Sequence, residues 1–240
     1  MPDAPIRALL FDVFGTVVDW RSGVDREGRS LAERRGIEGV DWAEVADRWR
    51  ALYQPSMQAV RSGERPFANL DVLHRESIER VVAELGIEGL TASDLDELTL
   101  AWHRLDPWPD AVEGLTRLKA HYILATQSNG NIALMVNMAK RAGLPWDLVL
   151  GAEVTGHYKP EPECYRRACG LLGLPGEQCM MVAAHPGDLE AARNAAGMRT
   201  AYIPRPLEYG DPARHRPPAE GVTFDVTATD LVDLARQLGA

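Results

Sequence analysis

The chain has 240 residues, which suits one large domain or a core with a smaller lobe. Hydrophobic residues make up 45% of it, enough to build a sizeable core and to exclude global disorder. The formal net charge of −9 argues against general binding to nucleic acid or to anionic membranes. Three of the 26 basic residues are lysines (Lys119, Lys140 and Lys159), so a lysine inside a motif carries weight.

The three cysteines, Cys164, Cys169 and Cys179, are odd in number and lack the spacing of a metal site. A disulfide framework and a zinc site are therefore not expected, and a reducing cytoplasm fits this use of cysteine. Residues 1–7 have no basic region followed by an apolar stretch, so no signal peptide is expected. No run of about 18 apolar residues exists, so no membrane span is expected. The chain is predicted to be cytoplasmic.

The first predicted element is a short buried strand over Ile6–Phe11, which ends abruptly at Asp12. From about residue 21 to 104 the chain is charged and helix-periodic. Within it, the segments Trp42–Val60 and Leu70–Leu85 place apolar residues three and four apart. No convincing strand interrupts this region, so it predicts an insertion of about four helices.

After this region, strands and helices alternate, which predicts an α/β fold with a parallel sheet covered on both faces. The predicted helices are Asp110–Ala120, Ile132–Ala142, Glu161–Leu172 and Asp188–Ala196. The predicted strands are Tyr122–Thr126, Leu148–Leu150, Cys179–Ala184 and Thr200–Ile203, with a strand end and a helix over Asp225–Leu238. The segment Pro204–Gly221, rich in Pro and Arg, is predicted to be a solvated surface connection.

Polar residues stand at the ends of four predicted strands, where ligands bind in parallel sheets. Asp12 is costly to bury there unless it is paired or functional, although a capping role is an equal alternative. The segment 126–131 either offers N–H groups and polar side chains to an anion or forms an ordinary helix N-cap. Lys159 precedes the next predicted helix. Asp188 lies in the first turn of another, where it either acts chemically or caps the helix.

These clusters together form a pattern that none of them makes alone. Asp-x-x-Gly-Thr at 12–16, Ser-Asn-Gly at 128–130, Lys-Pro at 159–160 and Asp188 follow successive strands. The pattern resembles the haloacid dehalogenase superfamily, whose fold is a Rossmann-like parallel sheet core with an α-helical cap inserted after the first strand.

The resemblance covers both core segments and implies two domains. Residues 1–19 and 105–240 would form the Rossmann-like core, and residues 20–104 the helical cap. The family often forms dimers, so a homodimer is compatible with the resemblance.

Two departures from the superfamily's phosphatases favour a dehalogenase. Phosphatases carry a second aspartate two residues after the nucleophile, which protonates the leaving alkoxide; Phe14 stands there instead. They also carry a magnesium-binding acid four residues before the last aspartate, where this chain has Ala184. Chloride, bromide and iodide leave without a proton because their acids are strong. A dehalogenase therefore needs no general acid, and neither a metal nor a cofactor is expected.

The segment 11–16 resembles the L-2-haloacid dehalogenases of type II, which have an aromatic residue at the position of Phe14. Trp49-Arg50 resembles the place in the second cap helix where that family keeps its halide-binding arginine. Considered alone, Arg50 could equally be a solvated helix charge. The resemblance implies that Arg50 and Asn129 receive the halide.

The same resemblance implies roles for the remaining catalytic residues. Asp12 would attack the carbon that bears the halogen and form an ester. Thr16 would donate a hydrogen bond near it, and Lys159 would pair with Asp12 and keep it ionised. Tyr165 would help to fix the lysine. Asp188 would position or activate the water that cleaves the ester.

Further residues would bind and enclose the substrate. Ser128 and the backbone N–H groups near Val13 and Phe14 would hold its carboxylate, and Phe14 and Phe67 would wall the pocket. Where the type II pattern has Ser-Ser-Asn, this chain has Ala183-Ala184-His185. His185 could hydrogen-bond the water or the departing halide, or stand behind them as a neutral group. A compact pocket with this extra donor could suit fluoroacetate.

The sequence thus predicts a hydrolytic dehalogenase that converts small 2-haloacids to 2-hydroxyacids and halide. The expected partners are the 2-haloacid and the halide, with no nucleic acid and no membrane. Two alternatives stay open: a metal-dependent phosphatase of the same superfamily, and a non-catalytic relative that binds a small carboxylate.

Overall fold

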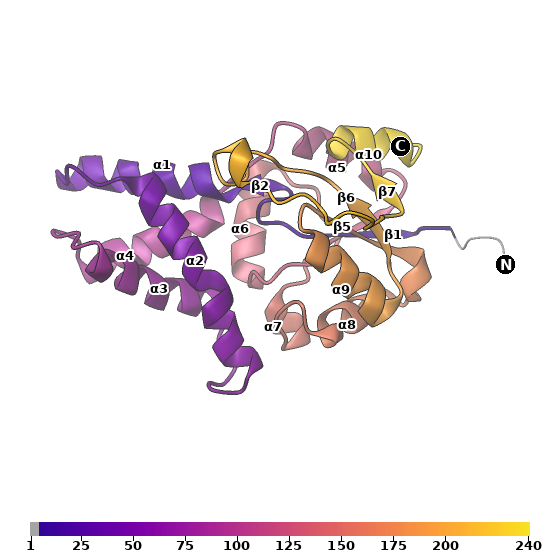
Figure 1. Cartoon of the computed structure of the whole chain (residues 1–240), viewed down its shortest axis with the longest axis horizontal. Coiled ribbons are helices and arrows are strands. Elements are labelled where there is room, and N and C mark those ends of the chain that lie inside the picture. The colour runs from indigo at the N-terminus through magenta and orange to yellow at the C-terminus, as the bar shows by residue number, and fades with distance from the viewer. Residues whose placement is uncertain (1–4) are drawn as a thin grey trace.

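The structure is a computed structural model that describes residues 5–240. It has a sheet-containing lobe at one end and a lobe of helices at the other (Figure 1). The expectation that no signal peptide is present rests partly on residues 1–4, which lie outside the described part. Among the described helices, none combines the length and the apolarity needed to cross a bilayer.

A five-stranded sheet forms the centre of the larger lobe, in the order β4-β1-β5-β6-β7. Its strands are β1 (Ala8–Phe11), β4 (Ile123–Thr126), β5 (Cys179–Ala183), β6 (Arg199–Tyr202) and β7 (Val226–Thr227). All neighbouring strands are parallel. The predicted α/β fold is confirmed. β1 lies inside the sheet and is buried along its whole length, which explains its unbroken apolar sequence.

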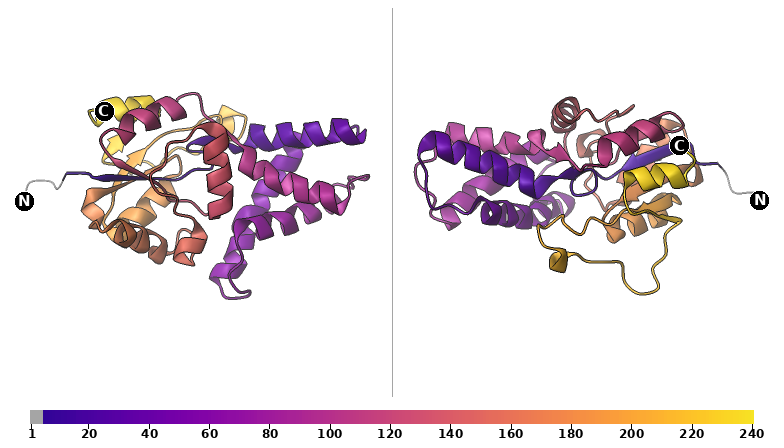
Figure 2. Two further views of the ribbon diagram at one scale, coloured as in Figure 1. Left: turned by 180° about the vertical axis from the view of Figure 1, so that it is seen from behind. Right: turned by 90° about the horizontal axis from the view of Figure 1, so that it is seen from above.

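Helices cover both faces of this sheet (Figures 1 and 2). Alternate residues of β1 point to opposite faces: Leu9 and Phe11 to one cluster, Ala8 and Leu10 to another. The first cluster includes residues of α5 (Ala111–Lys119), α6 (Ile132–Ala142) and α10 (Leu231–Gln237). The second includes residues of α8 (Pro162–Leu172) and α9 (Pro186–Ala196).

The smaller lobe consists of helices between residues 20 and 104. These are α1 (Trp20–Arg35), α2 (Trp42–Arg61), α3 (Leu70–Glu84), α4 (Ala92–Thr99) and the 3₁₀ helix η1 (Leu100–Arg104). Each α-helix begins after a side chain that accepts a hydrogen bond from an N–H of its first turn. Such N-caps explain where these helices start along a mostly polar sequence. The capping residues are Asp19, Asp41, Asn69 and Thr91.

The chain crosses between the lobes twice, and the crossings are paired. β2 (Val18–Asp19) and β3 (Asp106–Pro107) form an antiparallel ladder. Aromatic packing continues across this junction: the Trp20 and Trp102 rings stack with centroids 6.1 Å apart, and Phe14 meets Trp102 edge-on at 5.6 Å. Residues of both lobes thus share one hydrophobic cluster.

The strand predicted over Leu148–Leu150 is wrong. This segment forms an isolated bridge, between Leu148 and Ala125, in which the Leu148 N–H donates to Leu124 and the Leu148 carbonyl accepts from Thr126. The Thr126 hydroxyl donates to the carbonyl of Leu150 and accepts from its N–H, at 3.1 and 2.9 Å. The Thr126 hydroxyl thus takes the place of the Thr126 carbonyl in one bond of the ladder, and regular pairing stops there. The short helix α7 (Ala152–Thr155), which was not predicted, follows directly.

The prediction that Pro204–Gly221 is a solvated connection is also wrong for its first part. Arg205 and Glu208 are buried. The Arg205 guanidinium makes two 2.7 Å hydrogen bonds to the carboxylate of Asp110, and its Nε donates to the carbonyl of Thr16. Further on, the 3₁₀ helix η3 (Pro212–Arg214) reaches α2, where Arg214 donates to Asp47. The segment therefore runs along the junction of the lobes (Figure 2).

Candidate active site

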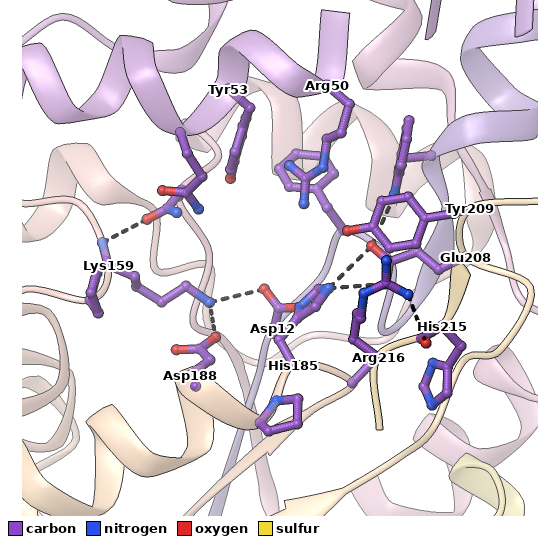
Figure 3. Close-up of a pocket in the computed structure, with 18 of the residues that line it drawn as sticks. Asp12, Arg50, Tyr53, Lys159, His185, Asp188, Glu208, Tyr209, His215 and Arg216 are labelled. Atoms are coloured by element: carbon purple, nitrogen blue, oxygen red, sulfur yellow. Dashed lines mark hydrogen bonds and ion pairs between the residues drawn. The ribbon is translucent and has the colours of Figure 1, made fainter. Parts of the chain in front are cut away.

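A cavity of about 800 Å³ lies at the carboxyl ends of the strands, between the two lobes. Its walls come from the core at the ends of its strands, from α1 and α2 of the helical lobe and from the segment 204–221. Figure 3 shows Asp12 at its centre, with Lys159 and Asp188 on one side, Glu208 on the other, and Arg50 above. The parallel sheet explains this meeting, because all its strands end at the same edge.

Asp12 is buried and held through both carboxylate oxygens. The Lys159 ammonium donates to Oδ1 at 2.9 Å, and the Thr16 hydroxyl donates to Oδ2 at 2.7 Å. His185 Nδ1 lies 3.0 Å from the same Oδ2. Burial favours the neutral acid, but the charges and hydrogen bonds of Lys159 and His185 outweigh it and hold the pKa of Asp12 far below its usual range. Asp12 is therefore a carboxylate.

Lys159 bridges two carboxylates, those of Asp12 and Asp188. Besides Asp12, its ammonium donates to Oδ2 of Asp188. Burial would lower the pKa of Lys159, yet Asp12 and Asp188 raise it. The pKa of Asp188 is raised above its ordinary value by burial and by the neighbouring Asp12 charge, against the effect of Lys159. Tyr165 donates to Asp188 Oδ1. Tyr165 thus holds Lys159 through Asp188, with no direct hydrogen bond between them among the described residues.

Arg50 of α2 lies above Asp12 and is half-buried. Its guanidinium carbon lies 4.1 Å from the ring centroid of Tyr53 and 5.4 Å from that of Trp20. Its Nη1 is buried and has no hydrogen-bond partner within the described residues. A buried donor of a cation that has no partner is costly, and an anion bound at this point would relieve that cost. The alternative that Arg50 is a solvated helix charge is wrong.

The turn after β4 and the turn after β1 offer further donors. Asn129 lines the cavity, and its Oδ1 accepts from the N–H of Lys159 at 2.8 Å. The Ser128 oxygen accepts from the Gly130 N–H at 3.1 Å, which leaves its own proton to donate. The N–H groups of Val13 and Phe14 have no acceptor in the part of the chain that the structure describes. Phe14 lines the cavity, whereas Ser128 and Val13 lie buried beside it.

The structure does not bring Phe67 into the cavity, so the prediction that it walls the pocket is wrong. Phe67 is 39% exposed and lies in the connection before α3. Its ring stacks on the outside of Tyr158, with centroids 5.5 Å apart. The Tyr158 hydroxyl donates to the carbonyl of Ala68 and so fixes this connection. Trp20 and Tyr53 supply the aromatic wall instead, together with Phe14.

Glu208 is the residue of the site that the sequence did not reveal. His185 Nε2 lies 3.0 and 3.1 Å from its two oxygens, and Trp20 Nε1 donates to Oε1 at 3.0 Å. Burial lowers the pKa of His185, but hydrogen bonds to Asp12 and Glu208 outweigh it and raise the pKa to about 10. This balance favours the charged imidazolium over the neutral ring that was one option for His185. A lone glutamate among prolines gave no motif from which to predict this contact.

Gly15 makes room for Glu208. Its φ of +84° is the left-handed region that glycine adopts without strain. A Cβ at this position would lie 2.3 Å from Glu208 Oε1. The glycine of the Asp-x-x-Gly-Thr motif therefore allows both the turn after β1 and the approach of the carboxylate from the segment 204–221.

Comparison with known proteins agrees with this arrangement. Residues 6–196 match the model of the haloacid dehalogenase-like hydrolases, and the chain belongs to that family. It is 30% identical over 210 residues to (S)-2-haloacid dehalogenase 4A of Burkholderia cepacia, covering 85% of this chain and 87% of the relative. It is 50% identical to a defluorinating L-2-haloacid dehalogenase of known structure, with a TM-score of 0.91 and coverage of 98% and 96%.

A third structure, the L-2-haloacid dehalogenase of Xanthobacter autotrophicus with chloropropionic acid covalently bound, is 25% identical. Its TM-score is 0.80, and the match covers 98% of this chain and 99% of that one.

Proposed function

We propose that this protein is a hydrolytic dehalogenase that converts small 2-haloacids to 2-hydroxyacids and halide through an ester on Asp12. One observation carries the proposal: the ionised Asp12 faces a cavity roofed by Arg50, whose Nη1 is a buried donor with no partner among the described residues. A carboxylate nucleophile and an empty anion position are what displacement of a halide needs. The names of the relatives above support the same reaction.

In the first step, Asp12 attacks the carbon that bears the halogen. A carbon–oxygen bond forms, and the halide departs with the electron pair of the carbon–halogen bond. Arg50 and Asn129 receive it. Ser128 and the free backbone N–H groups at Val13 and Phe14 hold the substrate carboxylate, which fixes the attacked carbon near Asp12.

In the second step, water cleaves the ester. The raised pKa of Asp188 makes it a stronger base than an ordinary aspartate, and Asp188 takes a proton from the attacking water. Lys159 contacts both Asp12 and Asp188, so it can pass a proton to the departing 2-hydroxyacid. Tyr165 keeps Asp188 in position.

The donor set does not fit magnesium, which the superfamily's phosphatases use. Lys159 and the His185 imidazolium already neutralise Asp12, and Phe14 and Ala184 offer no side-chain oxygen at the two positions where phosphatases have acids. Within residues 5–240, no group of three His, Cys, Asp or Glu side chains is placed to hold a metal ion. No step of the proposed reaction passes through a metal.

The proposal also covers the division into domains, the cellular location and the oligomeric state of the protein. Residues 1–19 and 105–240 form the core and residues 20–104 the cap. The cysteines of the described chain are buried and free, which supports a cytoplasmic location. A homodimer is proposed from the family resemblance, and light scattering of the purified protein tests it.

Halide release tests the function directly. The protein is incubated with L- and D-2-chloropropionate, chloroacetate and fluoroacetate, with and without EDTA. We expect release that EDTA leaves unchanged, that Asp12→Asn abolishes, and that Asp96→Asn, at an exposed position on α4, retains. No release from any substrate would overturn the proposal. Magnesium-dependent hydrolysis of p-nitrophenyl phosphate, lost in Asp12→Asn, would establish the phosphatase instead. Tight binding without turnover would establish a non-catalytic relative.

A further inference from the structure

An acid–imidazole–acid chain joins the segment 204–221 to the nucleophile (Figure 3). Glu208 lies 3.0 Å from His185 Nε2, and His185 Nδ1 lies 3.0 Å from Asp12 Oδ2. Ionised carboxylates are acceptors only, so both ring nitrogens of His185 must donate. With Asp12 and Glu208 both ionised, the ring is therefore doubly protonated and positively charged, and it is aimed at one particular oxygen of Asp12.

The two oxygens of Asp12 are held differently. Oδ2 accepts from the Thr16 hydroxyl at 2.7 Å as well as from His185, and these two bonds use both of its lone pairs. The Thr16 oxygen accepts from the Ala184 N–H, so its proton stays directed at Asp12. Oδ1 accepts only from Lys159 among the described residues. A free lone pair for attack on carbon is therefore left on Oδ1.

We infer that His185 is a catalytic residue of ester hydrolysis: with Thr16, it stabilises the oxyanion that forms on Asp12 Oδ2, and Glu208 is the positioning residue that holds it there. This inference rests on the proposed dehalogenase function and assigns a role to His185, at which the chain departs from the type II pattern. Donors already in place where charge develops are among the largest contributions to catalysis.

The electrons and protons balance as follows. Oδ1 forms the ester bond, which leaves Oδ2 as the ester carbonyl oxygen. Water adds to Cγ of Asp12 and gives a proton to Asp188, while the carbonyl pair moves onto Oδ2. When the intermediate collapses, the Cγ–Oδ1 bond breaks and the alkoxide takes a proton from Lys159. Asp188 returns its proton to Lys159, and the carboxylic acid of Asp12 loses its remaining proton to solvent.

Several contacts fix Glu208 for this role. It is 4% exposed, Trp20 Nε1 donates to it, and Gly15 leaves it the space it occupies. Burial opposes ionisation of Glu208, but the charge and hydrogen bond of His185 outweigh it and lower the pKa of Glu208. The other charged groups that line the cavity are Asp47 and Arg50 of α2, Lys159, Asp188 of α9, and Arg214 and Arg216 of the segment 204–221.

Rapid-quench kinetics with L-2-chloropropionate separate the two chemical steps. Halide release reports formation of the ester, and intact-protein mass spectrometry reports the fraction of protein that carries it. In His185→Gln, the loss of one oxyanion donor predicts a rate of ester hydrolysis lower by about 100-fold or more. The halide burst of one equivalent should persist, and the ester should accumulate. Glu220→Gln, at an exposed position of the same connection, should behave as the wild type.

The pH dependence of ester hydrolysis in Glu208→Gln is a second readout. It would stay unchanged if Glu208 had only a structural role. In the ester, Asp12 carries no charge, so Glu208 is the carboxylate beside His185 that keeps the ring protonated. With the charge of Glu208 removed, the pH at which ester hydrolysis declines should therefore fall toward 6.5, the ordinary pKa of histidine. This variant also keeps the inference falsifiable if His185→Gln fails to fold, which circular dichroism would reveal.

The outcomes are distinguishable. If the wild type releases halide but the variants slow ester formation as much as hydrolysis, so that no ester accumulates, the inference is overturned and the proposed function stands. An unchanged pH profile in Glu208→Gln likewise overturns the role of Glu208. If the wild type releases no halide, the proposed function and the inference fail together.

Discussion

The two sides of Asp12 are built in different ways. On one side, Lys159, Asp188 and Tyr165 come from segments that follow strands or lie in adjacent helices of the core, and the fold alone brings them together. On the other, His185 reaches a glutamate from a long irregular segment. In the proposed mechanism, the first side holds the oxygen that attacks, and the second holds the oxygen that carries the oxyanion. The comparison indicates that the two oxygens of one carboxylate can serve different steps of a reaction, because each oxygen has its own hydrogen-bond partners.

Removal of the cation on the first side should have the largest effect. In Lys159→Met, Asp12 and Asp188 are left as buried carboxylates without the ammonium that pairs them. Breaking a buried ion pair from one side costs about 3–5 kcal/mol. We expect the free energy of unfolding, measured in urea at neutral pH, to fall by about that amount, and halide release to be lost. Lys140→Met, on the far end of α6, is the control. A Lys159→Met protein as stable as the wild type would contradict the pairing.

Gly15→Ala probes the second side through its packing. An alanine is opposed both by the positive φ at this position and by the close contact that its Cβ would make with Glu208. We expect a loss of unfolding free energy of about 2–3 kcal/mol. Gly143→Ala is the matched control, since Gly143 has a φ of +69° but a Cβ added there would have no atom within 4 Å. It should lose only the backbone part, about 1–2 kcal/mol. Equal losses in the two variants would show that Glu208 does not occupy this space.

The His185 charge should make stability depend on pH. Its pKa is raised from 6.5 to about 10 in the folded protein. The stabilisation from protonated His185 is therefore complete below pH 6.5 and is lost as the pH rises through about 10. We expect the difference in unfolding free energy between the wild type and His185→Gln to shrink over this window in chemical denaturation. A difference that grows with pH would mean that His185 is neutral in the folded state.

Phe67→Ala should have the smallest effect on activity. The ring lies outside the cavity and touches the site only through Tyr158. Loss of the stacked pair should cost about 1 kcal/mol of stability. The kcat and KM for halide release should stay within a factor of two of the wild-type values. A large rise in KM would instead indicate that Phe67 contacts the substrate.

The sequence predicted the parts of the site that the regular fold places. The proximity of Asp12, Lys159 and Asp188 could be predicted because parallel strands end at one edge of the sheet. Arg50 came from the family resemblance, since nothing in its helical spacing separates it from a solvated charge. Glu208 could not be predicted, because its position depends on the path of an irregular segment and on the space left by Gly15. Phe67 was misplaced because the connection before α3 turns its ring outward, onto Tyr158.

The most direct test of the central claim is a single turnover in H₂¹⁸O with protein in excess over L-2-chloropropionate. If Asp12 forms an ester that water cleaves at Cγ, the label enters the carboxylate of Asp12, and the product 2-hydroxyacid stays unlabelled. Mass spectrometry of the peptide that contains Asp12 and of the product measures both. Label found in the product, with none in Asp12, would show direct attack of water on the substrate and would contradict the account.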